Sequence, residues 1–201
     1  MITKQPVLDI MKYKILILIL FCGCNTLLAQ VKHEREFRIK KKEFPSAAHD
    51  LLKDKVVAAK KLKYYKEIDS LKISYEAKFR KDKLWYSIEF NEEGVLEDIE
   101  ISIKSIDVPN ETYEAIQNYL STHFISFKIK KIQQQYTAED PIDKTFKNAF
   151  QNLMLPSVNY ELVVDAKQER GYEQFEILFN AEGTFLKIRK SLPPNYDHVL
   201  Y

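Results

Sequence analysis

Few side chains in this sequence have the types and spacing that catalysis or metal binding requires. The four histidines, His33, His49, His123 and His198, are widely separated, and none belongs to a His-Glu-x-x-His pattern. Metal ligands and activated nucleophiles often occur in short motifs, because one turn or helix must present them together. The chain has four glycines and neither a Gly-x-Ser-x-Gly motif nor a phosphate-binding loop. The sequence therefore predicts no metal site and no cofactor, and it does not favour an enzyme.

Two runs of charge could in principle bind ions. Glu92 and Glu93, with Glu97 and Asp98, form the densest acidic patch in the sequence. A calcium loop needs ligands at alternating positions around a sharp turn, so a solvated turn is the better interpretation. The three lysines at positions 40–42 could attract an anionic partner, but nearby glutamates offset them, and we interpret them as a solvated strand end.

The N-terminus has the pattern of an export signal. Lys12 and Lys14 precede an apolar run over residues 15–21, and Leu27-Leu28-Ala29 offers a small residue for cleavage. This run is shorter than the roughly 20 residues that span a bilayer, so an uncleaved anchor is the weaker interpretation. We predict a signal peptide over residues 1–29, with Met11 as the true start, and export to the periplasm or the cell exterior. The alternative is a lipoprotein anchored through Cys24.

Cleavage after Ala29 would change both the cysteine content and the charge of the chain. Cys22 and Cys24 are the only cysteines, so the mature protein would contain neither a disulfide nor a thiol. Removal of three lysines and one aspartate from 31 basic and 29 acidic residues leaves 28 of each. This balance argues against a nucleic acid or an anionic membrane as the partner, and no transmembrane segment is expected in the mature chain.

Two copies of one short stretch predict the tips of two β-hairpins. They are Phe90-Asn91-Glu92-Glu93-Gly94 and Phe179-Asn180-Ala181-Glu182-Gly183, each between alternating apolar and polar residues. Asparagine opens such a turn well, and glycine adopts the left-handed conformation that lets the returning strand pair. We therefore expect positive φ angles at Gly94 and Gly183.

The elements around these tips predict a duplicated unit. A strand near residues 37–40 leads through Pro45 to a helix capped by Ser46, and 64 residues later Pro109 and Asn110 repeat the pattern. A meander of antiparallel strands follows each helix. The second copy contains an additional helix near residues 140–154, capped by Asp140 with Pro141 in its first turn.

This organisation predicts an α+β fold. We expect two fused helix-plus-meander repeats, at residues 30–107 and 108–192, to share one continuous or near-continuous sheet with the helices on one face. Residues 193–201 would form a tail after Pro193-Pro194.

Trp85, the only tryptophan, is the first candidate for binding. If Tyr86 and the alternate residues after it face the helices, the period of two places Trp85 and Glu89 on the opposite face, beside Glu76 and Lys78. Tryptophan is enriched at binding hot spots. The alternative is that Trp85 merely covers the sheet edge or meets the C-terminal tail.

The capped helix, the Tyr-Glu-containing strand and the Phe-Asn-x-Glu-Gly hairpin resemble the PepSY-like domains of exported bacterial proteins. The tandem copy is similar to the two-repeat architecture of β-lactamase inhibitory protein. This resemblance covers roughly residues 37–190 and implies a secreted protein that binds or inhibits another envelope or extracellular protein without catalysis. The matched positions, Pro45, Pro109, Gly94 and Gly183, are structural. The alternatives are an assembly-associated envelope component and, less favoured, an envelope hydrolase with a dispersed site.

Overall fold

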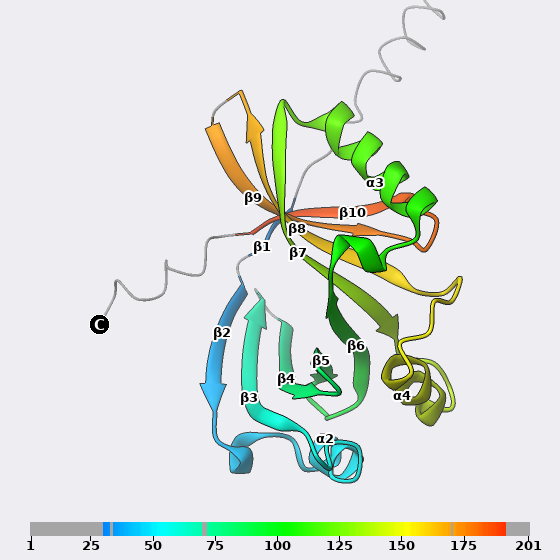
Figure 1. Ribbon diagram of the computed structural model, residues 1–201. Coiled ribbons are helices and arrows are strands. Elements are labelled where there is room, and N and C mark those ends of the chain that lie inside the picture. The colour runs from blue at the N-terminus through cyan, green and yellow to red at the C-terminus, as the bar shows by residue number, and fades with distance from the viewer. Residues whose placement is uncertain (1–29, 33, 70–71, 170, 192–201) are drawn as a thin grey trace, which may run out of the picture.

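The computed structural model describes residues 30–191, except residues 33, 70–71 and 170 (Figure 1). The predicted signal peptide, with Cys22 and Cys24, and the predicted tail at 193–201 lie outside the described residues. Within the described residues, no helix is long and apolar enough to cross a membrane.

The described residues form ten strands, three α-helices and two short 3-10 turns. In chain order they are β1 (Gln30–Lys32), β2 (Glu34–Ile39), η1 (Lys41–Glu43), α2 (Ser46–Leu52), β3 (Lys60–Asp69), β4 (Lys72–Lys81), β5 (Leu84–Asn91), β6 (Leu96–Ile103), η2 (Ser105–Asp107), α3 (Asn110–His123), β7 (Ser126–Thr137), α4 (Ile142–Phe150), β8 (Asn159–Gln168), β9 (Gly171–Phe179) and β10 (Phe185–Ser191).

All ten strands belong to one sheet, in the order β1-β10-β9-β8-β7-β6-β5-β4-β3-β2. From β2 to β10 every neighbouring pair is antiparallel, and the β6–β7 pair joins the first half of the chain to the second. The sheet is strongly twisted, so β2–β6 and β7–β10 form two groups in Figure 1. The α+β class and the continuous sheet are therefore as predicted.

The N-terminal segment was not predicted to reach both edges of this sheet. Strands β1 and β2 are separated by one residue, yet they occupy opposite ends of the strand order. Strand β1 pairs in parallel with β10, and β2 pairs with β3. Nearby, Arg189 on β10 donates a hydrogen bond to Asp69 on β3, with 2.9 Å between the atoms. The sheet therefore curls until its two edge regions approach one another.

All three α-helices cover the same face of the sheet. Phe44, just before α2, packs against Tyr75 and Phe90, while Tyr119 of α3 lies edge-on to Phe179. Phe150 of α4 lies edge-on to Tyr86. These sheet residues share one face with the fully buried Phe79, Ile88, Ile99, Ile101 and Leu162. Burial of this apolar face is the main source of stability, and it agrees with the predicted placement of the helices.

Both predicted hairpin tips are present. Gly94 and Gly183 have φ angles of 80° and 79°, and their amides donate to the carbonyls of Asn91 and Asn180. The Asn91 and Asn180 side chains accept further bonds from the backbone of the same turns. Each tip also touches the start of a helix: a Cβ at Gly94 would lie 2.9 Å from a backbone nitrogen in α2, and one at Gly183 would lie 2.6 Å from a backbone oxygen in α3. Glycine therefore permits both the φ angle of the turn and the close approach of the tip to the helix.

The predicted helix caps were wrong by one residue. The residues that precede α2, α3 and α4 are Pro45, Pro109 and Pro141, and none of the three helices has a side-chain cap bond. Their carbonyls accept the first backbone bonds of the helices. Proline has the required φ angle built into its ring, so Ser46 and Asn110 fall inside the first turn instead of capping it. Pro141 likewise precedes α4 instead of lying in its first turn.

Candidate functional site

The face opposite the helices carries the predicted binding residues. Across β4 and β5, Glu76 lies opposite Glu89, Lys78 opposite Ser87, and Arg80 opposite Trp85. The alternate residues Tyr86, Ile88 and Phe90 are buried on the helix side. The predicted placement of these side chains on the polar face is therefore confirmed, whereas their role in binding stays a prediction.

The polar face is partly buried although no helix covers it. Glu67, Glu76 and Glu100 are between 4% and 8% exposed, and Gln133 is 5% exposed. Among the described elements the helices lie on the other face, so neighbouring strands of the curled sheet shield these side chains and this face is the inner one. Charged groups that lose water in this way need internal partners.

Three carboxyl groups from three strands meet at one side of this face. Oxygens of Glu36 on β2, Glu67 on β3 and Glu76 on β4 all lie within 4.8 Å of one another. Lys78 Nζ donates to Glu36 Oε2 at 2.6 Å and lies 2.7 Å from Glu76 Oε2. Lys78 therefore forms ion pairs with both carboxylates. The Lys78 ammonium also lies 4.9 Å from the centre of the Tyr65 ring.

These contacts change the proton affinities of both partners. Burial raises the pKa of Glu76 well above its usual value, and the neighbouring Glu67 raises it further, while Lys78 opposes the shift. Burial alone would lower the pKa of Lys78, but Glu76 and Glu36 outweigh it and raise the pKa. Three carboxylates at this spacing have the oxygen ligands that a cation site would need, and the sequence did not predict that they meet. Lys78 already supplies a positive charge there.

A second group of carboxyls lies on β6 and β8. Gln133 of β7 donates to Glu100, and Gln135 of the same strand donates to Asp98 Oδ2 at 3.0 Å. Burial raises the pKa of Glu100 well above its usual value, with further increases from Glu161 and Asp98. Burial, followed by the charges of Glu161 and Glu97, raises the pKa of Asp98 to about 7. Amide groups here provide hydrogen bonds without a positive charge. We call Glu36, Glu67, Glu76, Asp98, Glu100 and Glu161, together with Lys78, the acidic centre.

The same face is basic where β2 ends and β3 begins. Arg38, Lys61, Lys63 and Arg80 are exposed there, and Trp85, which is 43% exposed, lies opposite Arg80 on the neighbouring strand. Strand β3 has a bulge near Lys61, whose φ is 59°. The Nζ atom of Lys61 lies 5.4 Å from the centre of the Trp85 ring. We call these four cations and Trp85 the basic end.

The predicted site residues therefore separate into two environments. Glu76 and Lys78 belong to the acidic centre, and Glu89 lies directly across from Glu76. Trp85 belongs to the basic end instead. The acidic centre lies apart from the Glu92–Asp98 patch except for Asp98, and its carboxylates are not clustered in the sequence because they come from separate strands. The sequence contained one indication of this cluster, namely acidic residues at the polar positions of successive strands.

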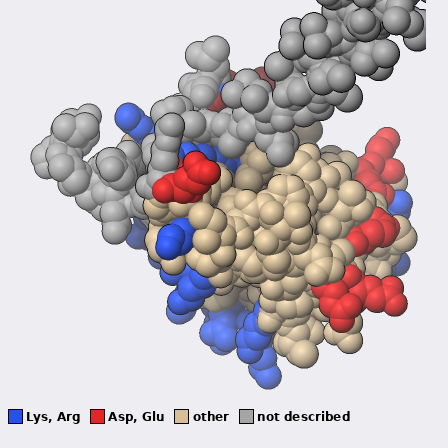
Figure 2. Space-filling model, turned by 90° about the horizontal axis from the view of Figure 1, so that it is seen from above, with Lys and Arg blue, Asp and Glu red and all other residues tan. Residues whose placement is uncertain are grey.

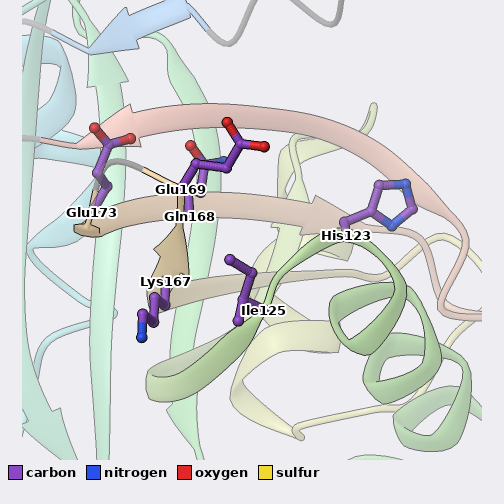
Figure 3. Close-up of a pocket in the computed structure, with 6 residues that line it drawn as sticks. All are labelled: His123, Ile125, Lys167, Gln168, Glu169 and Glu173. Atoms are coloured by element: carbon purple, nitrogen blue, oxygen red, sulfur yellow. The ribbon is translucent and has the colours of Figure 1, made fainter.

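A separate open pocket of about 580 Å³ lies between the end of α3 and the β8–β9 turn (Figure 3). It is lined by His123, Ile125, Lys167, Gln168, Glu169 and Glu173. His123 is engaged elsewhere: its ring stacks on Tyr119 and its Nδ1 lies 2.7 Å from the Tyr119 carbonyl oxygen. In Figure 3 the labelled side chains are spread around the hollow without converging on one point. The pocket therefore offers no assembled reactive group.

Comparison with known proteins identifies fold neighbours only. No protein-family model matches the sequence, and no curated protein matches it either. Among solved structures, a DUF2874 family protein from Bacteroides ovatus has 12% sequence identity and a TM-score of 0.48, over 73% of this chain and 87% of that one. A BLIP-like protein from Bacteroides fragilis has 14% identity and a TM-score of 0.47, over 73% and 86%. A protein from Bacteroides eggerthii, provisionally described as periplasmic, has 13% identity and a TM-score of 0.48, over 73% and 88%. At these values the likeness adds nothing about function, so this chain's own residues must carry that argument.

Proposed function

We propose that this protein is an exported, non-catalytic module that binds another envelope or extracellular protein through the polar face of its sheet. The observation that carries the proposal is Trp85. It is 43% exposed on a strand that has paired neighbours on both sides, while Tyr86 next to it is 3% exposed. An exposed tryptophan on an otherwise polar sheet surface is an efficient anchor for a partner, because it offers a large rigid apolar area.

The export part of the proposal rests on the leader-like residues 12–29. The secreted protein should begin at Gln30, since the apolar run ends in a cleavable Leu-Leu-Ala sequence. Intact-mass measurement of the protein recovered outside the cytoplasm tests this directly. A mass that includes a lipid-modified Cys24 would support the lipoprotein alternative.

We include the tandem PepSY-like architecture in this proposal. It is supported by the two glycine tips, each packed on the start of a helix, and by two matching 3-10 turns. In these turns the amides of Lys40 and Lys104 donate to Glu43 and Asp107, 64 positions apart in both cases. A duplicated unit with one exposed tryptophan implies that the binding surface belongs mainly to the first copy.

Replacement of Trp85 by alanine tests the binding role. The purified wild-type protein and the variant would be immobilised and exposed to an envelope extract, and the captured proteins quantified. We expect the captured partner to fall at least about tenfold, which corresponds to the loss of an aromatic anchor. Tyr172→Ala is the matched control, because Tyr172 is 70% exposed at the β9 end of the sheet.

The unfolding midpoints of both variants should stay close to that of the wild type. If Trp85→Ala unfolds at much lower denaturant while partner capture per folded molecule is unchanged, Trp85 is a structural residue and the proposal fails.

The acidic centre favours one second candidate, a hydrolase with a dispersed site. Carboxyl groups with raised pKa values, such as Glu100 and Asp98, can serve as general acids. Screening with peptidase, glycosidase and esterase substrates tests this candidate. Turnover that disappears in Glu100→Gln would replace the binding proposal with an enzymatic one.

A further inference from the structure

The cations of the basic end lack the carboxylate partners that other lysines of the protein have. Within the described part of the chain, Arg38, Lys63 and Arg80 have no carboxylate partner, and the contact found for Lys61 is with the Trp85 ring. By contrast, Lys72, Lys78, Lys144 and Lys190 each lie within 3 Å of a carboxylate oxygen. The positive charge at the basic end is therefore available to another molecule.

The nearest acidic side chains do not neutralise this end. Glu36 and Glu76 lie beyond it on the same face and are engaged with Lys78. Among the described residues, Asp82 in the β4–β5 turn forms no ion pair with these cations. Glu43 accepts a bond from the Lys40 amide. The cations around Trp85 consequently face solvent together.

A groove of about 510 Å³ continues this surface around the sheet edge. Its apolar part comes from Ile39, Leu62 and Tyr64, and its basic part comes from Arg38, Lys40, Lys41 and Lys63. Arg38 and Lys63 thus belong both to the groove and to the basic end. The groove has the character of a site for an extended chain with acidic and apolar side chains, because it combines cations with an apolar floor.

The mature chain predicted from the sequence has no net charge, although its basic and acidic side chains are grouped in different regions. The basic end lies at the lower end of the molecule in Figure 1, whereas Figure 2 shows the face seen from above, on which charged side chains of both signs lie around the margin of a broad uncharged area. Zero net charge argues against long-range attraction to a polyanion but does not prevent local recognition of a few carboxylates.

From these observations we infer that the basic end binds an acidic segment of a partner protein, with carboxylates against Arg38, Lys63 and Arg80 and an apolar side chain on Trp85. This inference rests on the proposed binding function and specifies the chemistry of the partner. Arginine and lysine differ in their roles here: the two arginines can form paired hydrogen bonds with a carboxylate, and the lysines act as point charges.

Trp85 itself provides the test, because it is the only tryptophan in the chain. A short polyglutamate peptide would be titrated into the wild-type protein while the tryptophan emission is recorded. Polyglutamine of the same length is the neutral control. The emission should shift and saturate with polyglutamate only, and the apparent affinity should fall as salt is raised because the contacts are exposed.

Charge-reversal variants test whether the peptide binds at the basic end. Arg38→Glu combined with Lys63→Glu should weaken binding at least about tenfold, since each lost exposed contact is modest and two are reversed. Lys128→Glu combined with Lys167→Glu makes the same change in net charge at exposed positions on β7 and β8. This control should leave the affinity within about twofold of the wild type.

Several outcomes would overturn the inference. Equal weakening by both variants would show nonspecific attraction, and binding that leaves the emission of Trp85 unchanged would place the peptide elsewhere. Tighter binding to phosphatidylglycerol vesicles than to the peptide would identify a lipid surface as the ligand. If polyglutamate fails but Trp85→Ala still abolishes partner capture, the acidic chemistry is wrong while the proposed binding function stands.

Discussion

The acidic centre and the basic end lie on the same face of the same strands, yet they handle charge in opposite ways. In the acidic centre, Glu67, Glu76 and Glu100 are buried, and its carboxyls are matched by Lys78 or by the amides of Gln133 and Gln135. At the basic end, the four cations are exposed and face solvent around a half-exposed tryptophan. The difference shows that position along the curled strands decides whether a charge helps to specify the fold or remains available for recognition.

The physical reason is desolvation. Where the sheet curls on itself, side chains of the polar face lose water, and unmatched charges there would cost several kcal/mol each. Where the strands end, solvent reaches the side chains and an unpaired lysine costs almost nothing. Raised pKa values at Glu76, Asp98 and Glu100 reflect the first situation.

The largest effect is expected from Lys78→Met, which removes the cation from the acidic centre. Glu76 and Glu36 would lose their counter-ion while Glu76 stays buried. The free energy of unfolding should fall by about 2–3 kcal/mol, less than for a fully buried pair because Lys78 is partly exposed. Urea unfolding at neutral pH measures the change.

Arg80→Met is the matched control for that experiment. Arg80 is two residues further along β4, exposed at the basic end. Its loss should change the free energy of unfolding by no more than about 0.5 kcal/mol. Equal destabilisation by the two variants would remove the distinction between the two regions.

A smaller effect of opposite sign is expected from Asp98→Asn. Its folded pKa of about 7 lies above the unfolded value of about 3.9, so the contribution of this group to stability is fully present below the lower value and is lost as pH rises through the higher one. The wild type should therefore gain stability as pH falls from 8 toward about 5. Above pH 7 the asparagine variant should be more stable by about 1–2 kcal/mol, and the gain should disappear below about pH 4.

Asp165→Asn is the control for the pH experiment. Asp165 lies on the same face but accepts a bond from Gln174 and lies 3.5 Å from Lys130. This variant should lose up to about 0.5 kcal/mol because an ion pair disappears. A pH profile of unfolding that is the same for Asp98→Asn and the wild type would contradict the desolvation of the acidic centre.

The smallest effect concerns the environment of Trp85 in the free protein. Because Lys61 and Arg80 lie close to the ring, iodide should quench its fluorescence at least about twofold more efficiently than caesium. Replacement of both cations by glutamate should reverse this preference. Complete protection from both quenchers would show that Trp85 is covered in solution.

Much of the scaffold follows from the sequence because its determinants are local. Alternation of apolar and polar residues identified the two faces of β4 and β5, since side chains alternate along any strand. Gly94 and Gly183 identified the hairpin tips, because few residues other than glycine tolerate these φ angles. The helix starts were displaced by one residue because proline can take the place of a polar cap.

The tertiary structure alone decided which charges meet. Glu36, Glu67 and Glu76 come from three strands, and a shift of one residue in any pairing would turn a side chain to the opposite face. The pairing of β1 with β10 could not be predicted either, because nothing in a three-residue strand specifies a neighbour some 160 positions away. The sequence therefore determined the hairpin tips, the helices and the face on which Trp85 lies. Only the curl and register of the complete sheet separated a buried acidic centre from an exposed basic end, because desolvation depends on which strands close over a side chain.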